Sequence, residues 1–214
     1  AAGGGGDISA RWIGDYAREK WKVPVIVENR PGAGATIAAA QLARAAPDGY
    51  TVALATTSPY TIAPYFQPVT YDPSKDFTYL FQFLVSAQPL FVRSDSAHKT
   101  WQEFVAWAKA NPGTLNWSTA ATNGGPHIAT EAAFRHLGIK GTYIPFKGGA
   151  EAITALLGGH IHALVAAEFP PYAAAGQVRL LAESGPDKIG DYPAVPTYKE
   201  LGMPLSVPSF YGIA

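Results

Sequence analysis

The repeated order of strand, loop and helix is the feature of this chain that most constrains its fold. Residues 50–55 read as a strand, a loop rich in hydroxyl groups follows, and a helix begins near Ile62. Residues 115–119, a small polar loop at 120–125 and a helix over 126–136 repeat that order. Such alternation is typical of layered α/β proteins with mostly parallel strands. Loops that follow the strands then lie along one sheet edge, where open α/β sheets bind their ligands.

The pattern also predicts two units. The chain passes from one to the other near residues 92–95, and a closing strand over 207–213 returns to the first. We therefore expect a first lobe made of residues 1–93 and 206–214 and a second lobe made of residues 94–205. Each lobe is expected to be a mostly parallel sheet flanked by helices. A cleft between two such domains is a preferred place for a small molecule.

Composition excludes several classes of function. The 214 residues carry 16 Lys plus Arg and 16 Asp plus Glu, so the formal net charge is zero and no nucleic-acid partner is expected. No apolar run in the sequence approaches the roughly 20 residues of a membrane span. The absence of cysteine removes disulfides, thiolate nucleophiles and cysteine-based zinc sites.

A glycine-rich turn opens the chain and leads into a segment with helical spacing. Gly3, Gly4, Gly5 and Gly6 precede Asp7, which stands where an N-cap residue would. Bare amides in the turn and the positive end of the helix dipole form a seat for an anion. A mobile terminus is the alternative. The turn alone does not decide between them.

Hydroxyl groups follow the strand at residues 50–55. Thr56 and Ser58 stand at its carboxyl end, with the ring of Tyr60 beside them. These hydroxyls either cap the next helix or contact a ligand, and the sequence leaves both interpretations open.

A lysine and two glycines precede a helix in the second half. Lys147 comes directly before Gly148 and Gly149. The lysine either brings a charge to an anion beside bare amides or is a solvated surface residue. His127, one residue inside its own helix, is expected to hold the loop at 119–123 in shape rather than to bind a ligand.

The residues offer little support for an enzyme. Gly32 to Ile37 lies between a strand-like run at 23–27 and a helix, as a dinucleotide fingerprint would, but Ile37 replaces its last glycine. No Gly-x-Ser-x-Gly elbow occurs, and Glu168 is the one acidic residue at a strand end. His160 and His162 lack an evident third metal ligand. We therefore expect no catalytic residue, no metal and no cofactor.

Five motifs, in order along the chain, resemble the periplasmic solute-binding proteins of tripartite tricarboxylate transporters, the TctC-like or Bug family. They are Ala-Ala-Gly-Gly-Gly-Gly-Asp at 1–7, Val-Glu-Asn-Arg-Pro-Gly-Ala-Gly at 27–34, Ala-Pro-Asp-Gly-Tyr-Thr at 46–51, Tyr-Asp-Pro-Ser-Lys-Asp-Phe at 71–77 and Pro-Phe-Lys-Gly-Gly at 145–149. Together they cover the whole chain at family-like spacing.

The resemblance implies a two-lobed, periplasmic-binding-protein-like fold of the Venus-flytrap type. It implies a periplasmic, monomeric protein that captures a small organic carboxylate between its lobes and delivers it to membrane transporter subunits. In the family, backbone amides and hydroxyls hold a carboxylate of the ligand. The corresponding residues here are Gly3, Gly4, Gly5, Gly6, Asp7, Thr56, Ser58, Thr119, Thr122, Asn123, Lys147, Gly148, Gly149 and Glu168.

The kind of carboxylate is less constrained. Tyr60 and Phe169 suggest an apolar wall, which favours a dicarboxylate or an aromatic acid. Glu168 stands where the family commonly has aspartate, and its charge suits an ammonium group instead. The alternatives are a nucleotide-dependent α/β enzyme and a sensing module that presents its closed form to a signalling partner.

Departures from the family pattern concern one loop and the ends of the chain. The loop at 118–127 lacks the usual Ser-Ala-Gly character, so its backbone path is expected to differ. The sequence begins without the family's first strand and stops before the helices that complete the first lobe. We therefore expect a longer protein, with apolar faces of the first lobe uncovered here.

Overall fold

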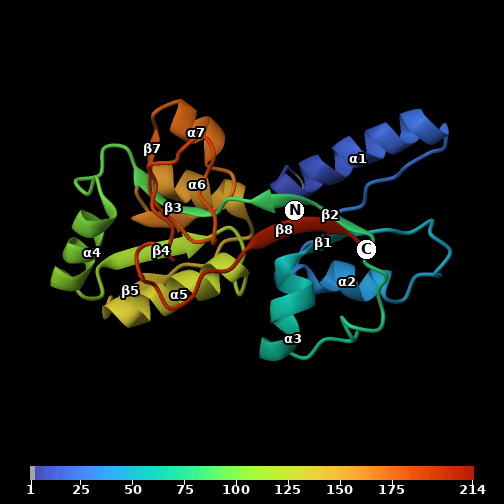
Figure 1. Ribbon diagram of the computed structural model, residues 1–214, viewed down its shortest axis with the longest axis horizontal. Coiled ribbons are helices and arrows are strands. Elements are labelled where there is room, and N and C mark those ends of the chain that lie inside the picture. The colour runs from blue at the N-terminus through green and yellow to red at the C-terminus, as the bar shows by residue number, and fades with distance from the viewer. Residues whose placement is uncertain (1–2) are drawn as a thin grey trace. The chain divides into compact units, whose positions relative to one another are not determined.

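A computed structural model of the chain describes residues 3–214 (Figure 1). It contains two compact units. The first consists of the described residues up to Leu84 together with Phe210–Ala214, and the second is Val85–Ser209. The chain therefore passes between the units twice, once within β2 (Phe81–Ser86) and once within β8 (Ser209–Ile213).

The first unit is built on a small sheet with the strand order β1-β8-β2. β8 pairs antiparallel with β1, and Tyr211 lies opposite Thr56. The last strand of the chain thus belongs to the first sheet. The unit's other elements are α1 (Gly5–Trp21), η1 (Ala33–Ala35), α2 (Thr36–Leu42), β1 (Leu54–Thr56), η2 (Ser58–Ile62) and α3 (Ala63–Phe66).

The second unit is built on a five-stranded sheet with the order β5-β4-β6-β3-β7. Its elements are β3 (Pro89–Arg93), α4 (Trp101–Ala110), β4 (Leu115–Thr119), α5 (Gly125–Leu137), β5 (Gly141–Tyr143), α6 (Gly149–Leu157), β6 (Ala163–Val165), α7 (Pro170–Ala174) and β7 (Val178–Glu183). β4 runs parallel to β5 and β6, whereas β3 runs antiparallel to β6 and β7. The carboxyl ends of β5, β4 and β6 therefore lie at the same edge.

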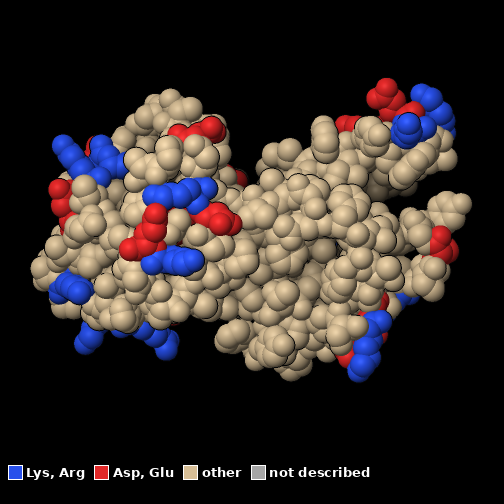
Figure 2. Space-filling view, in the orientation of Figure 1, with Lys and Arg blue, Asp and Glu red and all other residues tan. Residues whose placement is uncertain are grey.

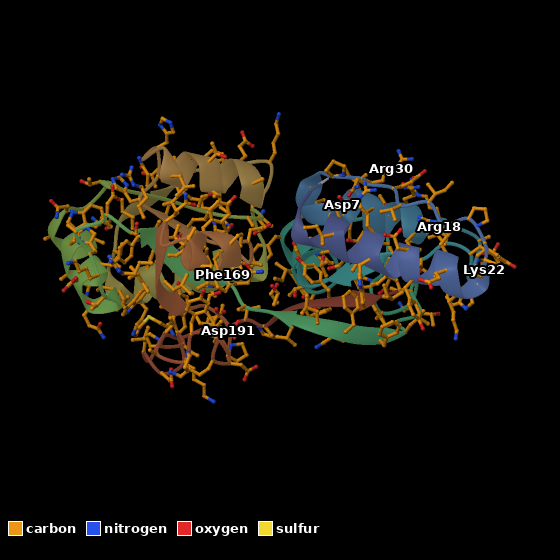
Figure 3. The ribbon with its side chains drawn as sticks, turned by 90° about the horizontal axis from the view of Figure 1, so that it is seen from above. Asp7, Arg18, Lys22, Arg30, Phe169 and Asp191 are labelled. Carbon is orange, nitrogen blue, oxygen red and sulfur yellow. The ribbon has the colours of Figure 1, made fainter. Side chains whose placement is uncertain are left out.

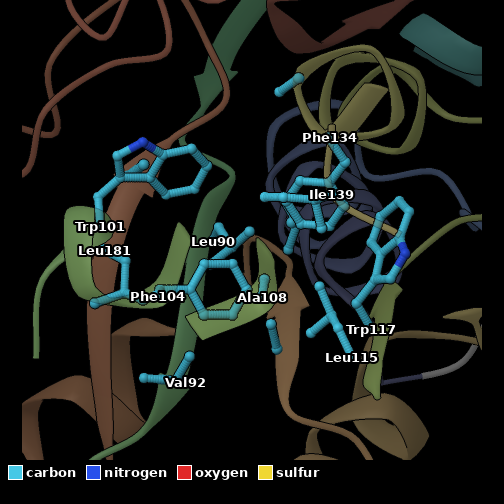
Figure 4. Packing of buried hydrophobic residues seen from close by; sticks show 14 of the residues in the cluster. Leu90, Val92, Trp101, Phe104, Ala108, Leu115, Trp117, Phe134, Ile139 and Leu181 are labelled. Carbon is cyan, nitrogen blue, oxygen red and sulfur yellow. The ribbon is translucent and has the colours of Figure 1, made fainter. Parts of the chain in front are cut away.

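Both faces of this larger sheet are buried. Alternate residues of a strand point to opposite faces, and accordingly Leu90 and Val92 join one core cluster whereas Phe91 joins another. Phe104 of α4 and Phe134 of α5 pack in the first cluster (Figure 4). α6 supplies apolar side chains to the second cluster. Helices on both faces account for the nearly continuous apolar runs of β3 and β6.

Local signals in the sequence set the helix ends in this unit. The Thr100 hydroxyl accepts a hydrogen bond from the Glu103 amide at 3.2 Å, so a capping box begins α4. Gly138 takes the left-handed conformation, with φ of 71°, and ends α5. These caps fix where the loops between strands and helices begin.

The first unit has a smaller core and more exposed apolar surface. Its buried cluster contains Tyr60 and Tyr71. α1 packs closely on the segment at 23–27, because a Cβ added at Gly14 would lie 3.3 Å from Val27. Three apolar residues spaced four apart on this helix are exposed: Ile8, Trp12 and Tyr16 are 62%, 71% and 61% exposed.

Three expectations from the sequence differ from the structure. Residues 23–27 form no strand, because no neighbouring strand pairs with them among the described residues. β3 belongs to the second sheet, so the units divide after Leu84 rather than near residues 92–95. The larger sheet is mixed rather than mostly parallel, because β3 is antiparallel to both neighbours, and in the smaller sheet β1 pairs antiparallel with β8.

On the face shown in Figure 2, basic and acidic side chains occur in several groups, most of them with both signs, and broad areas carry neither sign. Within residues 3–214, no helix is both long and apolar enough to cross a membrane.

Candidate ligand-binding site

The buried carboxylate of Asp7 holds the N-terminal turn. Its Oδ2 accepts hydrogen bonds from the Gly3 amide at 2.9 Å and from Arg11 Nε at 3.0 Å, and Oδ1 accepts one from Asn29 Nδ2 at 2.6 Å. Asp7 lies at the start of α1, with Arg18 and Lys22 toward the other end (Figure 3). These hydrogen bonds, led by that from Arg11, hold the pKa of Asp7 well below its ordinary value.

Asp7 therefore shapes the turn instead of capping the helix, which corrects the expectation from the sequence. α1 begins at Gly5, and Gly4 occupies the N-cap position without a side-chain cap. Both oxygens of Asp7 accept hydrogen bonds from the chain itself. The first-turn amides of a helix have no intrahelical acceptor, so the turn offers a ligand the backbone around Gly5 and Gly6. Ala1 and Ala2 of this motif lie outside the described residues.

Tyr211 joins this turn to the end of β1. A Cβ added at Gly5 would lie 3.3 Å from the Tyr211 hydroxyl, so a side chain there would crowd the ring. The backbone of Tyr211 pairs with Thr56. The next residue, Thr57, accepts a hydrogen bond from the Phe210 amide at 3.2 Å. The structure thus brings the glycine turn and the Thr56 to Ser58 loop together, as two predicted parts of one site.

Ser58 and Tyr60 have different environments in this loop. The hydroxyl oxygen of Ser58 is buried and has no hydrogen-bond partner within residues 3–214, and no side chain caps η2. Tyr60 is 6% exposed and packs edge-on against Phe77 and Tyr79. Ser58 therefore remains a candidate ligand contact, whereas the Tyr60 ring belongs to the core and forms no exposed apolar wall.

In the second unit, three of the predicted loops lie at one edge of the sheet. Thr119 ends β4 opposite Val165 of β6, and the next amide, of Ala120, donates to Val165 O at 3.2 Å. On the other side of β4, the Ser118 hydroxyl donates to Ile144 O at 2.7 Å. The loops after β4, β5 and β6 are therefore neighbours, because the three strands are parallel.

The loop that leads into α5 is organised by Tyr143 and His127. The Tyr143 hydroxyl lies 3.1 Å from the Thr119 hydroxyl and 3.0 Å from that of Thr122. The His127 ring stacks on Tyr143 with centroids 4.0 Å apart, and its Nδ1 accepts from the Asn123 amide at 2.9 Å. Asn123 has a φ of 59°, a left-handed conformation that asparagine tolerates. The predicted role of His127 in shaping this loop is confirmed.

The loop that leads into α6 brings a carboxylate against the helix start. Glu151 accepts a hydrogen bond from the Lys147 amide at 3.0 Å, and Gly148 occupies the N-cap position. A Cβ added at Gly149 would lie 2.5 Å from the carboxyl carbon of Glu168. Glu168 Oε2 is buried and has no partner in the described part of the chain. The Glu168 carboxylate thus occupies part of the anion-binding site that the sequence suggests at Lys147 to Gly149.

Two other predicted site residues contribute less. The Lys147 side chain is exposed. Phe169, labelled in Figure 3, is 4% exposed and packs edge-on against Tyr192. Phe169 is therefore a core residue. Like Tyr60, it does not form the exposed apolar wall of the ligand site that was expected from the sequence.

Each unit therefore presents donors suited to a carboxylate group. The first unit offers the backbone of the glycine turn and the Ser58 hydroxyl, and the second offers the start of α5 and the Thr122 hydroxyl, whereas the Thr119 hydroxyl donates its proton to Ala121 O at 2.9 Å. Backbone amides at a helix start bind anions through hydrogen bonds and the helix dipole. Among residues 3–214 no group of three or more His, Asp or Glu side chains is placed to hold a metal ion.

Sequence reasoning missed residues that organise the site from a distance. Asn29 completes the hydrogen bonds of Asp7, Tyr143 links two threonines, and Tyr211 lies against Gly5. Asn29 lies within a family motif, so the sequence carried a signal for it. Tyr211 lies about 200 residues from Gly5 in the sequence, and only the folded sheet brings them together.

Similar solved structures define the class of protein. The chain aligns over its full length with R. palustris Rpa4515 with adipate (25% identity, TM-score 0.90, 73% of that chain) and MatC from Rhodopseudomonas palustris with bound malate (28%, 0.86, 74%). It likewise aligns with the periplasmic binding protein BugD (27%, 0.85, 72%). The expected two-lobed α/β fold of periplasmic binding proteins is confirmed.

The family follows from the sequence. The profile of the tripartite tricarboxylate transporter family receptor, TctC, matches residues 9–214. The chain is also 38% identical over 213 residues to the "UPF0065 protein in gbd 5'region" of Cupriavidus necator. This alignment covers 99% of this chain and 65% of that protein. The chain belongs to the TctC receptor family. It spans 59–65% of the length of the curated relatives that it matches.

We expect His127 to make stability depend on pH. Burial lowers its pKa from the ordinary 6.5. A lowered folded-state pKa contributes stability that is present above the ordinary value and is lost as the pH falls through the folded-state value. In urea unfolding, the stability of the unmodified protein relative to His127→Gln, which keeps a neutral acceptor, should therefore fall from about pH 7 to about pH 5. His136→Gln, on the exposed side of α5, should follow the unmodified protein. A His127→Gln curve parallel to that of the unmodified protein would contradict this role.

The contact between Gly149 and Glu168 gives a second prediction. Gly149→Ala should destabilise the protein by about 1–3 kcal/mol, because the new methyl group would overlap the Glu168 carboxylate. In Gly149→Ala combined with Glu168→Ala, the loss should be smaller than the sum of the single losses. Gly190→Ala, where an added Cβ meets nothing within 4 Å, is the matched control. Strictly additive losses in urea unfolding would show that the two residues do not touch.

Proposed function

We propose that this chain is the binding portion of a periplasmic receptor that captures a small organic dicarboxylate. The receptor delivers this ligand to the membrane subunits of a tripartite tricarboxylate-type transporter. Membership of the TctC receptor family supports a solute-binding role rather than catalysis. The receptor acts as a monomer, without nucleic acid and without a cofactor.

The donors at the strand ends carry this proposal. In the second unit, the loops after β4, β5 and β6 meet at one edge and include the Thr122 hydroxyl and the start of α5. In the first unit, the glycine turn and the Ser58 loop meet at Tyr211. These groups are uncharged donors, which bind a carboxylate by hydrogen bonds and helix dipoles instead of an ion pair.

Three observations narrow the ligand class. Adipate and malate, bound by two structural neighbours, are both dicarboxylates. The burial of Tyr60 and Phe169 removes the support for an aromatic acid. The unpartnered Oε2 of Glu168 favours a dicarboxylate that also carries a hydroxyl or ammonium donor, because a buried acceptor without a partner is costly.

The structure lacks, within residues 3–214, the strand that the alternative of a nucleotide-dependent enzyme requires before Gly32. A dinucleotide fingerprint requires a strand directly before the glycine-rich turn. Residues 23–31 form no strand, and Gly32 to Ala35 lead into α2 through η1 instead. We therefore do not propose nucleotide binding.

Thermal unfolding with adipate and with malate tests the proposal. A ligand at a hundred times its dissociation constant adds about 2.7 kcal/mol of stability, so the melting temperature should rise with either compound. Malate should give the larger rise if Glu168 accepts from its hydroxyl group. The dimethyl esters, which lack the charged oxygens, are the matched controls and should have no effect. No rise with either acid would contradict the proposed ligand class.

Single substitutions assign the binding to the two units. Ser58→Ala and Thr122→Ala should each weaken binding of the effective acid by about tenfold, since each removes a hydrogen bond to a charged group. Thr142→Ala alters an exposed threonine of β5 and should leave the affinity unchanged. Calorimetric titration measures all three. Unchanged affinity in both Ser58→Ala and Thr122→Ala would place the ligand elsewhere.

A further inference from the structure

A buried carboxylate lies beside both connections between the two units. Glu183, at the end of β7, is 1% exposed. Its Oε1 accepts hydrogen bonds from the Gln88 amide at 2.9 Å and from the Gly185 amide at 2.7 Å, and Oε2 lies 3.0 Å from the Gln88 amide. Gln88 is the second residue after β2, the strand that carries the first connection.

The second connection is tied to the same place. Gln88 Nε2 donates to the Ser209 hydroxyl at 3.4 Å, and Ser209 is the last residue of the second unit before the chain returns to the first. The Ser184 hydroxyl donates to Gln88 O at 2.7 Å, and the Ser206 hydroxyl donates to Ser184 O at 3.2 Å. We call Gln88, Glu183, Ser184, Ser206 and Ser209 the junction cluster. It fastens both connecting segments to the end of β7.

Glu183 has no cation to balance its charge. Within residues 3–214 it forms no ion pair with Lys, Arg or His, and its acidic oxygens contact backbone amides alone. The other members of the junction cluster are uncharged. On the neighbouring segment, Tyr198 interacts electrostatically with Glu183, and Glu200 is already paired with Lys188 at 3.0 Å.

The geometry suits the protonated form of Glu183. The Gln88 amide is shared between Oε1 and Oε2, and the Gly185 amide donates to Oε1, so Oε1 keeps a hydrogen bond from each amide when Oε2 carries the proton. An ionised carboxylate in the same place lacks both water and a counter-charge, which is unfavourable in a buried site.

We propose that Glu183 is a proton-dependent latch on the two connections between the units. Protonated Glu183 holds the junction cluster in the arrangement described. Ionised Glu183 favours conformations in which its side chain reaches water, and these require its hydrogen bonds with the Gln88 and Gly185 amides to break. The affinity of the receptor for its ligand is then linked to pH through the chain segments that join its lobes.

The direction of the pH dependence follows from linkage. Burial raises the pKa of Glu183 from the ordinary 4.5 to about 7. A raised folded-state pKa contributes stability that is fully present below the ordinary value and is lost as the pH rises through the folded-state value. If the side chain is fully hydrated when the junction opens, the population of the open form rises about tenfold between about pH 6 and about pH 8.

Amide hydrogen exchange measured by NMR at about pH 6 and about pH 8 tests the latch. After correction for the intrinsic exchange rates, the protection of the Gln88 and Gly185 amides should fall up to about tenfold at the higher pH. The amide of Ala133, buried in α5, should keep its protection at both values. Equal corrected protection of Gln88 and Gly185 at the two pH values in the unmodified protein would overturn the proposal.

Glu183→Gln assigns the effect to this carboxylate. Glutamine is neutral and keeps an acceptor for both amides, so protection should be high and independent of pH. Glu131→Gln, which alters an exposed ion pair with Arg135 on α5, should behave as the unmodified protein does. A pH dependence that persists in Glu183→Gln would assign the latch to another group and overturn the proposal. The exchange data of the unmodified protein alone decide the matter if Glu183→Gln does not fold.

Discussion

The parallel pairing of β4 with both β5 and β6 is the constraint on which the second unit depends. Parallel strands require a crossover after each strand, so the three loops that follow them meet at one edge. The register is tight, because Thr119 lies opposite Val165 and the Ser118 hydroxyl reaches Ile144 O. The buried runs of β3 and β6 then hold the sheet between two layers of helices. Loops of small and polar residues occupy a fixed edge as a result.

Three buried or partly buried carboxylates show how one chemical group takes different roles in this chain. Asp7 is paired with Arg11 and amide donors, so it is ionised and structural. Glu168 lies against the start of α6 with one oxygen unpartnered, which suits contact with a ligand donor. Glu183 is held by amides without a cation, so its charge is unfavourable at neutral pH. The partners of each carboxylate, more than its residue type, decide its function.

The sequence predicts local features of this protein well. The capping box at Thr100, the left-handed Gly138 and the role of His127 depend on residues within a few positions of one another. The fold class and the family were also accessible, because glycine and polar loops follow strands in both halves and the five motifs lie in order. Local chemistry decides these features, so an isolated sequence is enough to predict them.

Features that depend on distant contacts were not accessible. The run at 23–27 has strand-forming residues but pairs with no strand in the part of the chain that the structure describes, so composition alone misassigns it. β3 belongs to the second sheet because β6 and β7 flank it, and both come much later in the chain. Tyr60 and Phe169 read as exposed aromatics at loops, yet each packs against other rings. Glu183 acquires its environment from Gln88, 95 residues away.

The central claim is that uncharged donors at the loop edges bind a dicarboxylate. An NMR titration of the 15N-labelled protein with malate tests it most directly, because each amide reports its own contact. We predict that the largest shift changes fall on the amides of Gly5, Gly6 and residues 120–125, with saturation at one equivalent of ligand. Saturable changes confined to other residues, or no changes at millimolar malate and adipate, would contradict the account.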